Sequence, residues 1–571
     1  MQRPNLQRRT ALLAMLAACG AVFLTALDQT VVVTALPKII ADLGISAEQL
    51  DRAAWIVSGY LLGYVIAMPL MGRVSDMYGR RRIFMICLGI FGAGSLFCGL
   101  APILGNQVDI SFLQSIGINV AAPGDFSDPT ALNPGLVWLV AARFVQAAGG
   151  GAIIPVAMAV AGDFYGDKQR ALALGLIGMV TEAGGVLGPL YGAIIVQNWG
   201  WQTIFFLNLP ILAILAYFIW RLIPSAGASI STDHVKARID LPGTLLMGAA
   251  LICLSLGLSQ EAATATTTGS GSSQAPIQNN PWLIGTSLVL LAAFIAIEIY
   301  LERRRDSSRL ESVSGQEKAR KRQILPIIEF SLFKRPAFAA SALVSFLVGS
   351  ALIIAMVNIP LFIATVLGGQ PLDSGLALLR LTALIPLGAI TGGWLCARIT
   401  CRLTAVIGLI FAALGFWLMH LWPVQVGWVQ ITTSTVIGGF GFGLVIAPIG
   451  TTAIDAVNNR QMGMASSVVT VLRVVGMILG LAALTSWGLG RFHDLLLAFK
   501  PPAGVTPLSN KYSAALAHYV IFAAHEVYTS IFLAASVLCL LAIIPAFLLE
   551  GRKPSPYVVR SSAFDRQNLM D

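Results

Sequence analysis

Charged side chains are scarce in this chain. Asp, Glu, Lys and Arg make up 11% of its 571 residues, whereas hydrophobic residues make up 56%. An ordinary soluble domain carries about 25% charged residues, so this composition excludes a water-soluble globule. It predicts an all-α integral membrane protein, because each long apolar segment must satisfy its own backbone hydrogen bonds in lipid.

Histidine and cysteine are also few. The five histidines show no HExxH arrangement, and the seven cysteines show no CxxC spacing. We therefore expect no metal site and no disulfide framework, and we interpret the cysteines as small packing residues. A phosphate loop of the form GxxxxGKS/T is missing too. The sequence thus predicts neither an enzyme nor a cofactor, and an ion gradient remains as the energy source.

Apolar segments of roughly 20 residues, long enough to cross a bilayer as helices, recur along the whole chain. The first of them follows two arginines but is too long for a cleavable signal sequence, so we expect it to be retained as a helix. Fourteen segments are predicted to span the membrane: 11–36, 53–72, 83–101, 136–161, 171–196, 202–222, 241–259, 282–301, 337–366, 375–397, 403–420, 427–453, 463–489 and 527–549.

Basic residues predict the orientation of these spans. With the N-terminus inside, most of the 37 Lys and Arg residues fall in cytoplasmic segments, as the positive-inside rule requires. We expect a multi-pass protein of the plasma (inner) membrane with both termini in the cytoplasm. The net charge of +10 then reflects topology and contact with anionic membrane lipids, and no nucleic-acid partner is expected.

The turn between the second and third spans reads GRVSDMYGRRR at 72–82. Gly72 and Gly79 permit close approach and a tight turn, and Asp76 can accept hydrogen bonds from a helix N-terminus or an arginine. Arg80 and Arg81 add positive charge on the inner side. The ordered pattern resembles the cytoplasmic signature of the major facilitator superfamily. The resemblance implies two six-helix halves that rock around a cavity, with these residues at the cytoplasmic gate.

The fifth span contains EAGGVLGPLYGA at 182–193. Gly184, Gly188 and Gly192 are four residues apart, so they lie on one helix face and allow another helix to pack closely. Pro189 removes one backbone hydrogen bond and bends the helix. We expect packing to be the main role of this face. The pattern also resembles the signature of drug:proton antiporters within the superfamily.

Other blocks are similar to the fourteen-helix drug:H⁺ antiporter-2 family: LDQTVVVTALP (27–37), WIVSGYLLGYVIAMPL (55–70), RFVQAAGGG (143–151), NWGWQTIFFLNLP (198–210) and DLPG (240–243). The resemblance implies a major facilitator fold with two pseudo-symmetric six-helix bundles and two extra helices between them, 14 spans in all. It divides the chain into an N-terminal bundle (1–222), the inserted helices (223–302) with a flexible outer loop (260–281), a basic cytoplasmic linker (303–335), a C-terminal bundle (336–549) and a cytoplasmic tail (550–571).

Two outer segments, 102–135 and 260–281, break the pattern of short loops. Either could dock a periplasmic or outer partner, although a tolerated loop insertion is the simpler interpretation. A further long outer segment, 490–526, adds to the case for the lipid exporter described below. Nothing in the sequence requires an oligomer, so we expect a monomer to function.

Ionisable residues inside the apolar spans are costly unless they pair or line a wet cavity. We single out five such residues in the predicted spans: Asp28, Arg143, Glu182, Arg380 and Arg473. The family resemblance implies that Arg143 faces Asp28 in a proton pathway, with Glu182 as a second proton site or a counter-charge for a cation. Arg473 would neutralise Glu182 or bind an anionic head group. The alternative is that these residues form only fixed salt bridges, and Arg380 would simply extend to the membrane surface.

We expect the substrate cavity to include Glu182, Arg473, Tyr60 and Gln146, with simple packing as the alternative for Tyr60. The leading functional hypothesis is a proton-coupled exporter of small lipophilic, often cationic compounds or drugs. The runner-up is a proton-driven exporter of lipids or glycolipids, since Asp28, Glu182 and Arg473 together resemble a lipid-exporting branch of the family. A third hypothesis is a membrane sensor or scaffold that does not transport.

Overall fold

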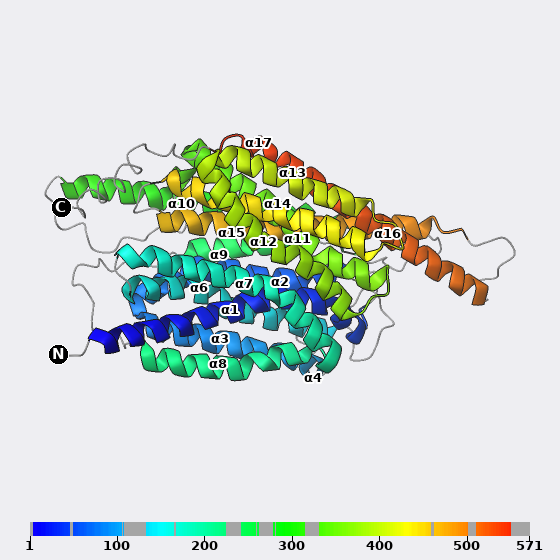
Figure 1. The fold of residues 1–571 in the computed structure, drawn as a ribbon, viewed down its shortest axis with the longest axis horizontal. Helices are drawn as coiled ribbons and strands as arrows, with labels where there is room; N and C mark the ends of the chain where they lie inside the picture. The colour runs from blue at the N-terminus through cyan, green and yellow to red at the C-terminus, as the bar shows by residue number, and fades with distance from the viewer. Residues whose placement is uncertain are drawn as a thin grey trace, which may run out of the picture.

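A computed structural model describes residues 4–45, 50–105, 107, 133–164, 167–223, 241–258, 260–261, 278–279, 281–313, 330–457, 462–500 and 510–549. The molecule is an elongated bundle of long helices whose axes run roughly along its longest dimension (Figure 1). The end at which α1 finishes and α2 begins is called the outer end here, following the orientation predicted from the basic residues.

Among the described residues, the N-terminal half contains seven helices. They are α1 (Pro4–Asp42), α2 (Leu50–Tyr78), α3 (Arg80–Gly99), the short α4 (Ala101–Gly105), α6 (Pro134–Phe164), α7 (Asp167–Trp199) and α8 (Gln202–Leu222).

Two further helices follow, α9 (Leu241–Leu258) and α10 (Pro281–Val313), which pack against each other. Between them β1 (Gln260–Glu261) pairs antiparallel with β2 (Gln278–Asn279), so the expected flexible loop is closed at its base by a short hairpin. A one-turn helix, η3 (Phe330–Lys334), then precedes the second half.

The C-terminal half contains α11 (Pro336–Thr365), α12 (Pro371–Arg398), α13 (Cys401–His420), α14 (Trp428–Asp455), α15 (Met462–Leu497), α16 (Asn510–Leu541) and the short α17 (Ile543–Ala546). Twelve helices of the described residues are long and apolar enough to cross a membrane, and shorter apolar stretches at Ala53–Met68 and Pro242–Leu258 complete the fourteen expected positions. The predicted all-α fold is therefore confirmed.

The two halves lie side by side, the N-terminal one blue to blue-green and the C-terminal one yellow-green to red (Figure 1). They meet through α7 with α12, α2 with α15 and α1 with α11. At the first of these seams, Thr382 Oγ1 donates a hydrogen bond to the carbonyl oxygen of Val186 at 3.3 Å. The inserted helix α9 contacts both α2 and α15, so it lies against the junction of the two halves.

The turn between α2 and α3 is reduced to a single residue. Gly79 separates the two helices with φ +92°, a conformation that glycine adopts without the steric cost of a Cβ. The expected tight turn at this position is thus confirmed. The side chains of Gly72 and Asp76 lie outside the described part of the chain, and the roles predicted for them stay predictions.

The glycine row of α7 packs directly on α1, as expected. A Cβ at Gly184 would lie 2.7 Å from the carbonyl oxygen of Phe23, and a Cβ at Gly192 would lie 2.6 Å from that of Val31. These distances are shorter than any normal Cβ contact, so only glycine permits this helix separation.

Two threonines of α1 complete the contact with α7. Pro189 has no N–H group, so it leaves the carbonyl oxygen of Gly185 without its helical partner. Thr30 Oγ1 on α1 donates to that oxygen at 3.2 Å, and Thr34 Oγ1 donates to the oxygen of Pro189 at 3.2 Å. The proline bend and the threonines therefore fix the position of α1 along α7.

The outer segment 490–526, expected to be a connection between spans, is largely helical. Helix α15 continues to Leu497 and α16 already begins at Asn510, and α16 projects beyond the other helices in Figure 1. Phe499 packs against Tyr519 with ring centroids 5.0 Å apart, and the Tyr519 hydroxyl donates to the oxygen of Leu495. Hydropathy missed these turns because their polar residues lower the average while leaving helix propensity intact.

The expectation of seven unpaired cysteines is wrong for two of them. Cys396 near the end of α12 and Cys401 at the start of α13 form a disulfide across the turn. The helix–turn–helix geometry brings residues five positions apart together, which the absence of a CxxC spacing could not reveal.

Several predicted segments fall mainly or wholly outside the described residues. They are most of 102–135, the interior of 260–281, most of the linker 303–335 and the tail 550–571. Within the predicted linker, α10 continues as helix to Val313, and the predicted domain boundaries stay predictions.

We expect Gly188→Ala to destabilise the fold. A Cβ there would lie 2.8 Å from the carbonyl oxygen of Leu27 and would also press on Thr30, and such overpacking costs about 1–3 kcal/mol. The measurement is the thermal melting temperature of the purified protein in detergent. Gly185→Ala is the matched control, because its Cβ has no neighbour within 4 Å and alanine favours the helix. Equal melting temperatures for the two variants would contradict the close α1–α7 contact.

Candidate transport site

Asp28 lies in the middle of α1 and is fully buried inside the N-terminal half. Its Oδ2 atom is 2.6 Å from Nη1 of Arg143 on α6, and the two side chains are 0% and 1% exposed. The ion pair expected from the sequence is therefore present. Its part in proton transfer stays a prediction.

The second carboxylate oxygen of Asp28 is held by two side-chain amides. Gln146 Nε2 on α6 donates to Oδ1 at 3.0 Å, and Asn208 Nδ2 on α8 donates to the same atom at 2.9 Å. Both amides also donate to Ser95 Oγ on α3, at 3.2 and 3.0 Å. The Ser95 hydroxyl in turn donates to the carbonyl oxygen of Phe205. Four helices thus converge on one carboxylate.

Arg143 is oriented by several groups besides Asp28. Nη1 donates to Gln146 Oε1 at 2.7 Å, and Nη2 donates to the backbone oxygen of Asp28 at 3.4 Å. The guanidinium stands 4.0 Å from the ring centroid of Tyr60 and 5.7 Å from that of Phe205. Aromatic faces stabilise a cation where water is excluded, so the pair sits in a site built for charge.

The structure places two of the residues predicted for the substrate cavity beside the buried ion pair, and their contact with a substrate stays a prediction. Tyr60 is 1% exposed and Gln146 is 0% exposed, and both contact the Asp28–Arg143 pair. The side chains point into the N-terminal half because α2 and α6 pack on each other there. Hydropathy alone does not determine which face of each helix turns inward. We therefore assign Tyr60 and Gln146 to the charge network.

Glu182 and Arg473 form a looser contact between the two halves. Oε1 of Glu182 on α7 is 3.9 Å from Nη2 of Arg473 on α15, and the side chains are 44% and 25% exposed. Tyr64 on α2 lies within electrostatic reach of both. A pair with this separation and exposure contributes about 0–1 kcal/mol to stability, so it can open and close at little cost.

At the inner ends of α2 and α3, the gate predicted from 72–82 is described only in part. The guanidinium of Arg81 lies 5.1 Å from the centroid of the Trp220 ring on α8, which anchors the start of α3 to the end of α8. Arg80, the first residue of α3, is partly buried. Whether these residues gate a pathway stays a prediction.

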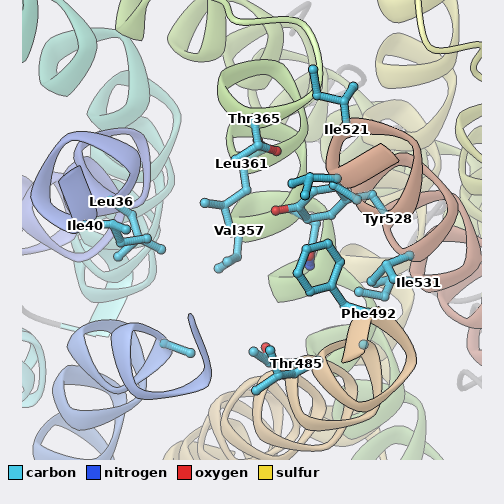
Figure 2. A pocket seen from close by; sticks show the side chains of 17 residues that line it. Leu36, Ile40, Val357, Leu361, Thr365, Thr485, Phe492, Ile521, Tyr528 and Ile531 are labelled. Carbon is cyan, nitrogen blue, oxygen red and sulfur yellow. The ribbon is translucent and has the colours of Figure 1, made fainter. Parts of the chain in front are cut away.

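A cavity opens between the two halves towards the outer end. It encloses about 920 Å³ of empty space, part of it open to the surroundings, and its walls come from α1, α2, α11, α15 and α16. Figure 2 shows Leu36 and Ile40 of α1 facing Val357 and Leu361 of α11 across the gap.

The walls of this cavity are mainly apolar. Their polar side chains are few and uncharged: Asn358, Thr365, Thr485 and Tyr528. Apolar walls with a few uncharged polar groups are typical of sites that bind lipophilic molecules or parts of them. The lining matches none of the residues predicted for the substrate cavity, because single Leu, Val and Ile residues in apolar helices carry no distinguishing signal.

Three polar residues were missed in the sequence. Asn208 lies within the quoted block NWGWQTIFFLNLP, and Ser95 lies in the third span. Each is a polar residue within an apolar helix, and that interruption could have identified it as a candidate site residue. Glu298 interrupts the apolar run of α10 and is fully buried, so it belonged with the other intramembrane ionisable residues. In the part of the chain that the structure describes, no group of three or more His, Cys, Asp or Glu side chains could hold a metal ion.

In the described part of the chain, each half contains six helices long enough to cross a membrane, and the two halves pack side by side. One half holds a buried charge pair, and a cavity lies between the halves. This arrangement defines a multi-pass membrane transporter. The family model of the Major Facilitator Superfamily matches residues 18–481, and the chain belongs to this family.

Curated relatives extend over most of the chain. A protein named triacylglyceride transporter from Mycolicibacterium hassiacum is 35% identical over 511 residues, covering 87% of this chain and 83% of the relative. A triacylglyceride transporter from Mycobacterium tuberculosis is 33% identical over 549 residues, covering 93% of each chain.

Solved structures share the fold at low identity. A bacterial homologue of the human lysosomal transporter Spinster, in an inward-facing and occupied conformation, has a TM-score of 0.59 at 16% identity and covers 94% of this chain and 96% of its own. The xylose transporter XylE from E. coli, in an inward-open conformation, has a TM-score of 0.52 at 12% identity, covering 96% and 98%.

We expect Arg143→Gln to destabilise the protein by about 3–5 kcal/mol, because it leaves the buried Asp28 carboxylate without its counter-charge. Asp28→Asn in the same chain removes that charge and should restore most of the lost stability. Thermal melting in detergent of the two single variants and the double variant measures the coupling. Additive losses in the double variant would contradict a mutually dependent buried pair.

Proposed function

We propose that this Major Facilitator Superfamily transporter exports neutral lipids or similar lipophilic molecules across the plasma membrane in exchange for protons. Both termini would lie in the cytoplasm, and the cavity between the halves would face the outer leaflet. The proton gradient would supply the energy, without a bound cofactor.

The buried Asp28 network is the observation that carries the proton part of this proposal. A carboxylate with no exposed surface, next to one arginine, can change charge only if the protein moves water or the partner group. The charge on Asp28 and its distance from Arg143 depend on each other, so a change in their separation would convert proton binding into a change of conformation. Coupling of this kind is the minimum that antiport requires.

The outer cavity supports a lipid as the transported molecule. Its walls carry no charged side chain among the lining residues, and apolar surface is the main source of affinity for acyl chains. Relatives that cover most of this chain are named triacylglyceride transporters. These names are the reason why we propose neutral lipids as the substrate class.

A small cationic drug is the second candidate, favoured by one observation. Glu182 is 44% exposed at the contact between the halves and could serve as counter-charge for a cation once Arg473 moves away. Membership of the fourteen-helix drug:H⁺ antiporter-2 family would agree with a drug as substrate. It would also agree with the fourteen apolar helical segments.

The decisive test is transport in proteoliposomes with an imposed pH gradient. We expect wild-type protein to move a labelled triacylglycerol between leaflets and to carry protons in the opposite direction. Asp28→Asn and Glu182→Gln should each reduce gradient-driven transport at least about tenfold, since either loss removes a group whose charge must change.

Asp42→Asn is the matched control, since this carboxylate lies on the same helix as Asp28 but forms a partly exposed pair with Lys38. Full transport by Asp28→Asn would contradict the proton assignment. Proton flux with a cationic dye but none with lipid would favour the drug exporter, and no flux with either would indicate a scaffold.

A further inference from the structure

Only the NH₂ group of the Asn208 carboxamide forms hydrogen bonds with described residues. The side chain is 0% exposed, and Nδ2 donates to Asp28 Oδ1 at 2.9 Å and to Ser95 Oγ at 3.0 Å. Its oxygen Oδ1 is buried and accepts no hydrogen bond from any described residue. Leaving a buried acceptor unused is costly, and such a group in a native site needs a reason.

Asp28 in its charged form is surrounded by donors. Arg143, Gln146 and Asn208 each give it a hydrogen bond. A proton that binds Asp28 turns one carboxylate oxygen into an O–H donor, which then needs an acceptor. Arg143 offers none, and Gln146 Oε1 already accepts from Arg143 at 2.7 Å and faces Cys98 Sγ at 3.6 Å.

The unused acceptor is already attached to a group that touches Asp28. A half-turn about the last torsion of Asn208 exchanges Oδ1 with Nδ2, and this type of torsion is broad and nearly two-fold. The exchange needs no backbone movement. It places the oxygen within hydrogen-bond distance of the protonated carboxyl.

We propose that the Asn208 carboxamide turns over when Asp28 takes up a proton, so that Oδ1 accepts a hydrogen bond from the new carboxyl O–H group. The proton stays on Asp28, and Asn208 keeps both of its own hydrogens. The inference rests on the proposed function, since it requires that Asp28 titrates. Asn208 is then a positioning residue that lets one buried site accommodate both charge states.

The turnover also has a consequence for packing. In the charged state Asn208 joins α8 to Ser95 on α3 through Nδ2. After the turnover Nδ2 no longer donates to Ser95, and the single O–H group of Ser95 can donate either to Asn208 Oδ1 or to the oxygen of Phe205, while Ser95 still accepts from Gln146. Protonation of a residue on α1 would in this way weaken the contact between α3 and α8.

Few other titratable groups face Asp28. Within its electrostatic reach are Arg143 on α6, Tyr60 on α2, Cys98 on α3 and Tyr191 on α7. Glu182 on α7 instead faces Arg473.

The remaining elements packed on α1 add no competing group near Asp28. On α8, Tyr217 is nine residues beyond Asn208, about 13 Å by helical rise, and α11 carries no ionisable side chain. On α12, Asp373 caps its own helix and Arg380 stacks on Trp428.

Infrared difference spectroscopy on protein grown with isotope-labelled asparagine tests the turnover. We expect acidification to produce a carboxyl C=O band that Asp28→Asn removes, together with a change in a labelled amide C=O band that both Asp28→Asn and Asn208→Leu remove. Asn208→Leu should keep the carboxyl band but shift it. Ser95→Ala should keep both signals, because it removes a partner of Asn208 but not the acceptor.

The outcomes separate this inference from the proposed function. A carboxyl band that depends on Asp28, with no accompanying amide change in the wild-type protein, would overturn the turnover alone. Absence of any Asp28-dependent carboxyl band would contradict the proton carrier and overturn the turnover with it. The spectra of the wild-type protein and of Asp28→Asn suffice for both decisions, even if an Asn208 variant does not fold.

Transport gives an independent readout. Asn208→Leu should reduce proton-driven export about tenfold and alter its pH profile, since an unsatisfied buried O–H group disfavours the protonated state. Asn208→Thr should retain more export than Asn208→Leu, because a hydroxyl can both donate and accept. An unchanged pH profile in Asn208→Leu would argue against the role given to this residue.

Discussion

The ion pair between Arg143 and Asp28 sets the conditions for the rest of the N-terminal half. Both side chains are withdrawn from solvent, and neither would be stable there without the other and without further hydrogen bonds. Gln146 on α6 and Asn208 on α8 supply those bonds to Asp28, and Ser95 on α3 accepts a hydrogen bond from each of the two amides. The position of α1 matters for the same reason, and the glycine row of α7 holds it by backbone-to-backbone contact.

The two halves of the molecule contribute different chemistry. The N-terminal half encloses a charge that can be neutralised, whereas the contact between the halves carries the exposed Glu182–Arg473 pair and an apolar cavity. A buried pair resists change and an exposed pair does not. Such a division allows a proton to be bound in one place while a lipophilic molecule is handled in another, with the movement of the halves as the link.

Much of this arrangement follows from the sequence by simple physics. The thickness of a bilayer defines the lengths of the apolar runs, glycines spaced by four predict the α1–α7 contact, and the cost of a buried charge predicts a partner for Asp28. These inferences hold because they depend on local spacing or on a large energy.

Other features depend on tertiary packing. Tyr60 and Gln146 lie on helices whose inward face is set by the packing of neighbouring helices, so their contact with the Asp28–Arg143 pair could not be predicted from hydropathy. Asn208 matters because of its distance to Asp28, 180 positions away in the chain. The projecting turns of α15 and α16 and the Cys396–Cys401 disulfide likewise depend on how helices continue or turn outside the apolar spans, where hydropathy gives no signal.

The central claim is that Asp28 changes its protonation state when the transporter binds its lipid. Proton release on addition of triacylglycerol to the purified protein, in weakly buffered detergent with a pH indicator, measures this most directly. The account predicts release from the wild-type protein and none from Asp28→Asn with lipid binding retained. Equal release from both proteins would contradict it.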